Sequence, residues 1–214
     1  MGIQERRQRE QEELRAKILD AAREMFASEG YDAVTMRKIA ETIEYSPTAI
    51  YLHFRDKETL IRELCGHDFL ELARKFQAMG GSIEDPLERL AAAGQAYFEF
   101  AVEHPHHYRL MFMMKSPAKP EDFPGARGNP EEDAYAFLLA AVNDCISAGL
   151  FRPEIADAEL VAQTCWAAIH GVVSLHIAKG DDEWVAWHAL EKRFGLMMEA
   201  VVRGLMRAPG CHGG

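Results

Sequence analysis

The sequence contains few cysteines and no excess of basic residues. Its 214 residues include four cysteines, and no two of them are spaced as Cys-x-x-Cys, so no thiolate metal centre or dithiol redox motif is indicated. Lys and Arg number 24 against 34 Asp and Glu, which gives a formal net charge of −10. This acidic balance excludes a protein that coats nucleic acid or an anionic membrane through a broad basic surface. It leaves room for small local groups of cations.

Signatures of catalysis, metal binding and export are also missing. No Ser/His/Asp or Cys/His set occurs in a recognisable context, and there is no glycine-rich phosphate loop, so we expect no catalytic residues and no cofactor. His104, His106 and His107 have no acidic or cysteine partner at a fixed spacing, which disfavours a metal site. The N-terminal residues are polar and charged, unlike a signal peptide. A cytoplasmic protein with reduced thiols is the simplest interpretation.

One uncharged run approaches the length of a membrane span. It covers the 19 residues Leu160–Ala178. The run also contains the polar residues Gln163, Thr164, His170, Ser174 and His176, and charged residues bound it on both sides. A helix that is apolar nearly all round is more often buried inside protein, so we interpret the run as a core or interface helix and expect no membrane partner.

Helical patterns fill the rest of the chain. Hydrophobic residues make up 48% and charged residues 27%, as in an ordinary globular protein, and no segment shows the alternation of a half-buried strand. Apolar residues recur at helical spacing between capping residues, prolines and glycines. The sequence predicts an all-α fold of about nine helices. Their expected ranges are 5–28, 36–43, 47–52, 57–79, 86–104, 106–114, 130–148, 158–179 and 182–206.

Two short predicted helices form the pattern of a helix-turn-helix module. Helix 36–43 is followed by a turn of about four residues and then by a second short helix that begins after Ser46. Small polar residues at the start of a second helix let its backbone approach base edges in the major groove. Thr35 and Ser46 are N-cap residues next to backbone N–H groups that can contact phosphate.

Residues 14–64 closely resemble the DNA-binding domain of the TetR family of transcriptional regulators. The matching runs are Ile18-Leu19-Asp20-Ala21-Ala22, Phe26, Glu29-Gly30-Tyr31, Thr35-Met36-Arg37-Lys38-Ile39-Ala40, Ser46-Pro47-Thr48-Ala49-Ile50-Tyr51-Leu52-His53-Phe54 and Arg55-Asp56-Lys57-Glu58-Thr59-Leu60. The resemblance implies a DNA-binding domain at residues 1–64 and a ligand-binding and dimerisation domain at 65–214. Thr48 stands where the family usually has a glycine.

The resemblance also implies which residues contact DNA. Phosphate contacts are expected from Thr35, Tyr51, His53 and Lys57, and groove contacts from Arg37, Ser46 and Thr48. Lys57 supports this assignment independently, because a cation at a helix start is unfavourable unless an anion such as phosphate lies nearby. Two other interpretations remain open: Tyr51 could pack between modules, and Lys57 could be a solvated surface lysine.

The charge is divided unevenly between the two predicted domains. Residues 1–64 hold 11 Lys and Arg and 13 Asp and Glu, whereas residues 65–214 hold 13 and 21. The cations of the first domain cluster at Arg6-Arg7-x-Arg9, Arg37-Lys38 and Arg55-x-Lys57. We therefore expect steeply salt-sensitive specific DNA binding with little non-specific affinity.

The C-terminal part resembles one branch of the same family through His104-Pro105-x-x-Tyr108-Arg109-Leu110-Met111-Phe112 and Trp166-x-x-x-His170-Gly171. The resemblance implies a homodimer through the last two helices, which both carry apolar residues on more than one face. It also implies a pocket for an apolar or amphipathic small molecule. The candidate pocket residues are Tyr97, Phe98, Met111, Met114, Tyr135, Leu138, Trp166 and His170, together with Phe100 and Phe137. Each could equally belong to the core.

The leading hypothesis is therefore a dimeric, ligand-responsive regulator, acting as a repressor, that binds double-stranded DNA at a pseudo-palindromic operator. One alternative is a small-molecule-binding or interaction module of the same fold that binds no operator. An all-helical enzyme is a third class, but no motif supports it. The sequence alone identifies neither the effector nor the operator.

Overall fold

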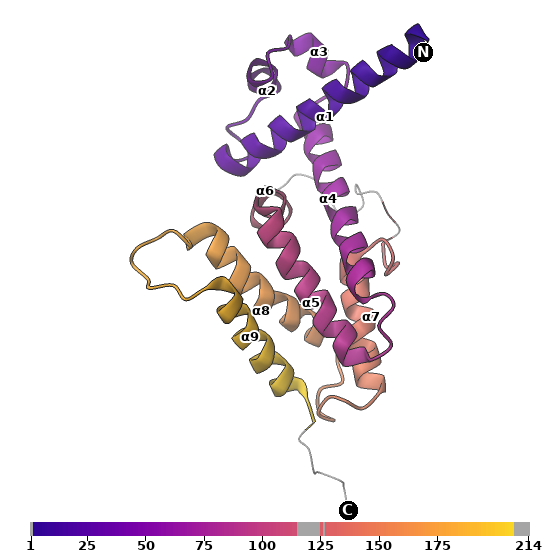
Figure 1. The fold of residues 1–214 in the computed structure, drawn as a ribbon, viewed down its shortest axis with the longest axis vertical. Coiled ribbons are helices and arrows are strands. Elements are labelled where there is room, and N and C mark those ends of the chain that lie inside the picture. Colours follow the sequence, from indigo (N-terminus) through magenta and orange to yellow (C-terminus); the bar gives the residue numbers. More distant parts are fainter. Residues whose placement is uncertain (1, 115–124, 126, 208–214) are drawn as a thin grey trace, which may run out of the picture. The chain divides into compact units, whose positions relative to one another are not determined.

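The computed structural model describes residues 2–114, 125 and 127–207, and within them the fold is all-α, as predicted (Figure 1). The helices are α1 Ile3–Glu29, α2 Met36–Thr42, α3 Pro47–Tyr51, α4 Lys57–Gly80, α5 Pro86–Glu103, α6 Pro105–Tyr108, the π-helical turn η1 Arg109–Met113, α7 Ala134–Ser147, α8 Ala158–Lys179 and α9 Leu190–Leu205. The described residues contain no strand, only one isolated antiparallel bridge between Phe151 and Met206.

The described chain divides into two compact units. The first holds residues 2–69 and 106–114, and the second holds residues 70–105, 125 and 127–207. The helix α4 contributes to both.

The first unit is built around the apolar stripe of α1. Ile18, Ala22 and Phe26 are completely buried, as their helical spacing predicts. Gly30 ends the helix in the left-handed region at φ +86°, a conformation that glycine adopts without steric cost. The same core receives side chains from α2, α3, the connection between α3 and α4, α4 and η1: Met36, Ile39, Ala40, Ile50, Phe54, Leu60, Ile61, Leu64, Cys65 and Leu110.

The segment after Pro105 differs from the single helix predicted at 106–114. A short α-helical turn is followed by the π-helical turn η1. The ring of Tyr108 is buried and lies 5.1 Å from that of Phe112, and Leu110 enters the core beneath α1. The change of helical pitch accompanies this packing, which sequence periodicity does not encode.

A buried ionic cluster ties this segment to α1 and α4. Asp68 is 1% exposed and is the one buried charged side chain among the described residues. Its Oδ1 lies 3.0 Å from Nη2 of Arg23 and 2.9 Å from Nδ1 of His107. Because a buried carboxylate is costly without a partner, the guanidinium of Arg23 compensates for the desolvation of Asp68.

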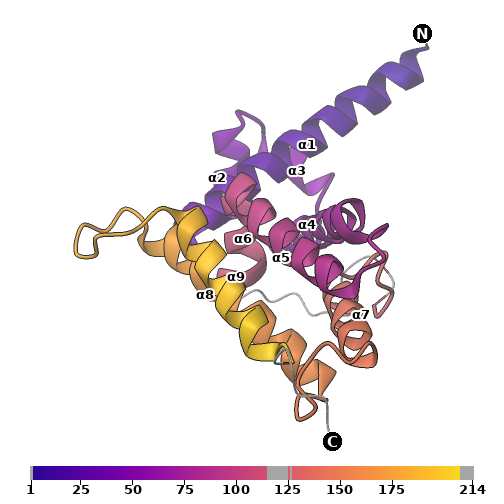
Figure 2. The same ribbon diagram turned by 60° about the horizontal axis from the view of Figure 1, so that its bottom comes forward.

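The second unit packs α5, α7, α8 and α9 around an apolar centre, and α8 and α9 run side by side (Figure 2). Its buried cluster contains Leu90, Ala141, Val142, Cys145, Phe151, Val161, Ala162 and Cys165. Asp85 and Asp157 cap α5 and α8 by accepting backbone N–H bonds, as predicted. The helix expected from Pro130 begins instead at Ala134, because the carboxylate of Asp133 caps the N–H groups of Tyr135 and Ala136.

Helix α8 has the predicted bounds, whereas α9 begins later than predicted. The buried stripe of α8 comprises Val161, Ala162, Cys165, Ile169 and Val173. The helix predicted from Asp182 begins eight residues later, at Leu190. The preceding segment forms local contacts of its own, in which the indole of Trp184 donates to Asp182 and the guanidinium of Arg193 lies 4.8 Å from the Trp187 ring.

The ionic cluster predicts a large effect of Asp68→Asn on stability. The substitution keeps the shape but removes the charge that compensates the mostly buried Arg23. We expect the free energy of unfolding to fall by about 3–5 kcal/mol, measured by denaturant titration. Asp20→Asn is the matched control, since Asp20 lies 3.3 Å from the same Arg23 but is solvent-exposed, and we expect a change below about 0.5 kcal/mol. Equal effects of the two substitutions would contradict a special role for the buried pair.

Candidate nucleic-acid interface and apolar pocket

Helices α2 and α3 form the helix-turn-helix expected from the sequence. Met36, Ile39 and Ala40 of α2 and Ile50 of α3 are buried in the core of the first unit. The turn between the helices is closed by a hydrogen bond from the N–H of Tyr45 to the carbonyl of Ala40. The opposite side of α3 consequently faces solvent.

The predicted groove-facing residues lie on this solvent side. Ser46 and Thr48 are exposed at the start of α3, and Tyr51 is 54% exposed at its end. His53 is half-buried just beyond the helix. The arrangement presents small polar side chains at the start of the helix and an aromatic ring at its end, and small residues at the start let the backbone approach base edges.

Two hydroxyl caps lie at the starts of the two helices. Oγ1 of Thr35 accepts the N–H of Lys38 at 3.2 Å, and Oγ of Ser46 accepts the N–H of Ala49 at 3.3 Å. Each oxygen accepts a hydrogen bond in its cap, so its own O–H group can donate outward to a phosphate oxygen or a base edge.

Arg37 is an exposed cation on α2. Its Nε lies 3.0 Å from a carboxylate oxygen of Glu41, one helical turn away, and both side chains are exposed. An exposed pair of this kind contributes little free energy, typically below about 1 kcal/mol, so Arg37 can exchange it for a contact with DNA.

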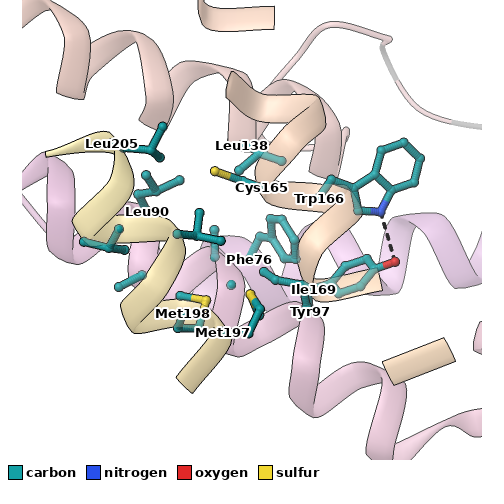
Figure 3. Close-up of a pocket in the computed structure, with 15 residues that line it drawn as sticks. Phe76, Leu90, Tyr97, Leu138, Cys165, Trp166, Ile169, Met197, Met198 and Leu205 are labelled. Atoms are coloured by element: carbon teal, nitrogen blue, oxygen red, sulfur yellow. Dashed lines mark hydrogen bonds between the residues drawn. The ribbon is translucent and has the colours of Figure 1, made fainter. Parts of the chain in front are cut away.

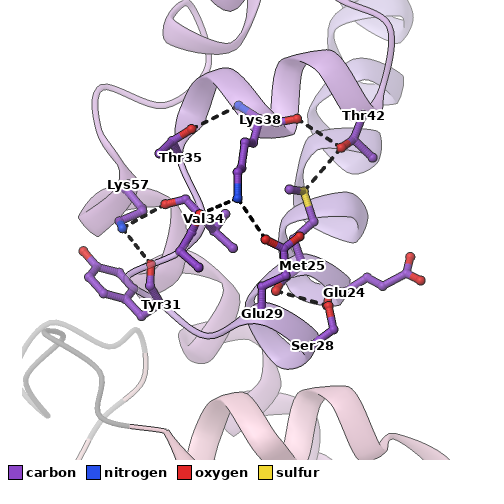
Figure 4. Close-up of polar contacts among 11 residues, drawn as sticks. Glu24, Met25, Ser28, Glu29, Tyr31, Val34, Thr35, Lys38, Thr42 and Lys57 are labelled. Carbon is purple, nitrogen blue, oxygen red and sulfur yellow. Dashed lines mark hydrogen bonds and ion pairs between the residues drawn. The ribbon is translucent and has the colours of Figure 1, made fainter.

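Lys57 is held inside the first unit, which the sequence did not predict (Figure 4). Its ammonium donates hydrogen bonds to the carbonyls of Tyr31 at 2.7 Å and Val34 at 2.9 Å, and lies 4.0 Å from the centre of the Tyr31 ring. An ammonium group has three N–H donors, and the two carbonyls use two of them. The expected contact with phosphate would therefore use the third N–H group of Lys57.

A second lysine supports the same connection from the other side. Lys38 donates to the carbonyl of Ala33 at 2.8 Å and to the carboxylate of Glu29 at 3.1 Å. The two ammonium groups thus fix residues 31–34, the segment that leads into the cap residue Thr35 (Figure 4). We call this arrangement the lysine clamp. The sequence did not predict the lysine clamp, because the carbonyls that Lys57 contacts lie 23 and 26 residues before it, and a backbone carbonyl gives no sequence signal.

The second unit contains an apolar pocket between α5, α7, α8 and α9 and the end of α4 (Figure 3). Its free space is about 550 Å³, the solvent at its open side included. The lining residues are Phe76, Leu90, Ala91, Ala93, Gly94, Tyr97, Leu138, Cys165, Trp166, Ile169, Met197, Met198, Val201, Val202 and Leu205. None of them is charged, and a mainly apolar lining is typical of small-molecule sites.

A hydrogen-bonded triad lies at one side of the pocket. Nε1 of Trp166 donates to Oη of Tyr97 at 3.0 Å, and that oxygen lies 3.3 Å from Nδ1 of His170 (Figure 3 shows the first bond). Burial lowers the pKa of His170, so its imidazole stays neutral near pH 7. A neutral Nδ1 accepts the Tyr97 hydroxyl proton when Nε2 carries the ring hydrogen.

Three of the predicted pocket residues, Tyr97, Leu138 and Trp166, line this pocket. His170 contacts it through Tyr97. Phe98 instead stacks on Phe194 with ring centres 4.1 Å apart, and the hydroxyl of Tyr135 donates to the carboxylate of Glu159 at 2.5 Å.

The remaining predictions belong elsewhere, and one wall was missed. Met111 and Met114 belong to the first unit, where Met114 packs against the core. Sequence reasoning missed the wall contributed by α9, namely Met197, Met198, Val201, Val202 and Leu205, because it assigned the apolar surplus of that helix to dimerisation.

The lysine clamp predicts that Lys57→Met destabilises the first unit without DNA. The substitution keeps the aliphatic stem but removes both charged hydrogen bonds, so we expect a loss of about 1.5–3 kcal/mol in the free energy of unfolding. Arg55→Ala is the control, because the exposed Arg55 donates a hydrogen bond to its neighbour Asp56. We expect the free energy of unfolding of this variant to change by no more than about 0.5 kcal/mol. Unchanged stability of Lys57→Met would show that Lys57 does not hold the connection.

Comparison with known proteins agrees with this geometry. Residues 18–64 match the family described as bacterial regulatory proteins, tetR family, and residues 90–201 match the tetracyclin repressor-like C-terminal domain. The chain is 30% identical over 165 residues to the HTH-type transcriptional repressor KstR2 of Mycobacterium tuberculosis, covering 72% of this chain and 79% of the relative. The corresponding repressor of Mycolicibacterium smegmatis is 29% identical over 164 residues, covering 72% and 77%.

Solved structures show the same fold. A TetR family transcription regulator from Marinobacter aquaeolei aligns with a TM-score of 0.72 at 22% identity, covering 94% of this chain and 100% of that one. The ketosteroid transcriptional regulator KstR2 of Mycobacterium tuberculosis aligns with a TM-score of 0.66 at 24% identity, covering 91% and 95%. From the two domain matches and the sequence relatives, the chain belongs to the TetR family of bacterial transcriptional regulators.

Proposed function

We propose that this TetR-family regulator is a homodimeric repressor that binds a pseudo-palindromic operator and is released by a small apolar or amphipathic molecule. The exposed polar face of α3, held by a core beneath it, is the observation that carries the proposal. The related KstR2 and AcnR proteins are named as transcriptional repressors. Action on DNA implies a cytoplasmic protein.

The DNA contacts follow from the geometry of the first unit. Ser46 and Thr48 supply small polar groups for base edges, while Arg37 and the hydroxyl of Thr35 supply donors for phosphate or bases. Tyr51 and His53 follow at the far end of α3. Since the first 64 residues carry slightly more acidic than basic groups, affinity depends on these few contacts rather than on a broad positive field.

The dimer surface follows from the exposure of α8 and α9. Among the described residues, α8 is the one helix long and apolar enough to cross a membrane by length and composition, but only 28% of its apolar window is buried. Leu160 and Leu175 of α8 are 61% and 50% exposed, and Leu196 of α9 is 69% exposed. Exposed apolar residues on two adjacent helices are typical of an interaction surface, and a second copy of the chain would bury them in a dimer interface.

A membrane is a poor cover for the same face. Gln163, Thr164 and His176 lie exposed on α8 among the apolar residues. Gly171 has nothing within 4 Å of the position where a Cβ would lie, so the protomer itself does not require glycine there. Close approach of a partner helix explains both the glycine and the mixed polarity of the face.

Operator binding is tested by fluorescence anisotropy with the duplex DNA upstream of the regulator's own gene. We expect specific binding whose affinity falls steeply with salt, and about a tenfold or greater loss for Arg37→Ala. The control is Arg152→Ala, an exposed arginine of the second unit, which should bind as the wild type. Failure of the intact dimer to bind at low salt would contradict the repressor and favour a module that binds only small molecules.

Dimerisation is tested with the double substitution Leu175→Glu and Leu196→Glu. Both side chains are exposed in the protomer, so helicity should be retained while the shared surface becomes charged. We expect a monomer by light scattering and a large loss of operator affinity, since one half-site gives little specificity. Val102→Glu places the same charge on an exposed apolar site of α5 and should stay dimeric. A dimer unaffected by the double substitution would place the interface elsewhere.

A further inference from the structure

The pocket has two chemically different sides. Leu90 and Leu205 lie on one side, and Trp166 and Tyr97 lie on the other (Figure 3). Apart from the thiol of Cys165, the hydroxyl of Tyr97 and the indole N–H of Trp166 are the polar side-chain groups among the lining residues. A molecule held in this pocket therefore meets hydrocarbon along most of its length and hydrogen-bonding groups at one position.

The lining limits the charge of such a molecule. No lysine, arginine, aspartate or glutamate lines the pocket, and the nearby His170 is kept neutral by burial. A carboxylate, phosphate or ammonium buried here would lose its hydration without gaining a counter-ion, which is strongly unfavourable. An uncharged oxygen is far cheaper to bury when it receives a hydrogen bond.

The triad can provide that bond by opening at Trp166. This indole is 38% exposed, whereas Tyr97 is buried and also contacts His170. Exposure allows the indole to move away from Tyr97 while Tyr97 and His170 remain in place. A ligand oxygen placed between Trp166 and Tyr97 would then accept a hydrogen bond from the indole N–H of Trp166. A ligand hydroxyl would also donate a hydrogen bond to the Tyr97 oxygen.

The opposite wall can adapt to the remaining hydrocarbon. A Cβ at Gly94 would lie 2.9 Å from Cε of Met198 and 3.2 Å from Cδ1 of Ile169, so the thioether end of Met198 occupies the space above this glycine. Met197 and Met198 are unbranched and flexible, which lets this wall change shape around an apolar guest.

We propose that the effector is an elongated, uncharged apolar molecule with one terminal hydroxyl or carbonyl oxygen, which inserts between Trp166 and Tyr97. Its hydrocarbon part lies along Leu90, Met198 and Leu205. This assignment rests on the proposed function, because it takes the apolar pocket as the effector site, and it adds the chemical class and the orientation of the ligand.

Calorimetric titration with three ten-carbon probes tests the class of head group. The probes are 1-decanol, sodium decanoate and decylammonium chloride at pH 7.4, each below its aggregation concentration. We expect 1-decanol to bind at least tenfold more tightly than either charged probe. Equal or tighter binding of decanoate would overturn the assignment of an uncharged head group.

Matched variants test the position of the oxygen. Tyr97→Phe keeps the ring but removes the hydroxyl, so we expect about a two- to twelvefold loss in 1-decanol affinity. Tyr45→Phe is the control, because Tyr45 is exposed in the first unit and does not line the pocket, and it should bind 1-decanol as the wild type. An unchanged affinity in Tyr97→Phe would overturn the placement of the oxygen.

Gly94→Ala separates this inference from the proposed function. The added methyl group pushes Met198 into the pocket, so it should weaken every probe whatever its head group, while the helix keeps its fold. If Gly94→Ala weakens the binding of all three probes but the wild type binds them equally well, only the assignment of an uncharged head group would be overturned. Absence of any probe binding, or binding unaffected by Gly94→Ala, would overturn the effector pocket as well, and operator binding measured on the same samples reports separately on the repressor.

Discussion

The DNA-reading surface depends on a core that its own helices are too short to form. Helix α2 has seven residues and α3 has five, and isolated helices of this length are unstable in water. Their geometry is therefore imposed by what they are packed against: the buried stripe of α1, the start of α4, and Leu110 from the distant segment η1. The lysine clamp adds polar bonds to the connection formed by residues 31–34, whose Val34 is also buried in this core. The position of α3 therefore depends on the packing of the whole first unit.

The second unit has more apolar surface than one core requires. On α9, Met197, Met198 and Val201 line the pocket, while Leu196 is exposed on the same helix. On α8, Cys165 and Ile169 point into the unit and Leu175 is exposed. Each helix can thus contribute one face to a ligand and another to a partner. Our proposed dimer and effector use different residues of the same two helices, so a change in the shape of one face can affect the other.

The sequence predicted features that depend on local spacing. The caps at Thr35, Ser46, Asp85 and Asp157 lie where a polar residue precedes an apolar period, and the left-handed Gly30 lies at the end of one. It failed where contacts between distant residues decide the outcome. The π-helical turn of η1 and the clamp of Lys57 on carbonyls more than 20 residues upstream both depend on such contacts. The pocket was half predicted, since aromatic residues on α5 and α8 were identified but the wall of α9 was not.

In the proposed complex, two copies of the exposed α3 face read two half-sites of one operator. Hydroxyl-radical footprinting of the bound operator tests it most directly, because the pattern reports both contact and spacing. Two protected patches of similar strength, with centres about 10–11 base pairs or a multiple of that distance apart, are predicted. Both patches should disappear together in Arg37→Ala. A single patch, or protection that is unchanged in Arg37→Ala, would contradict the claim.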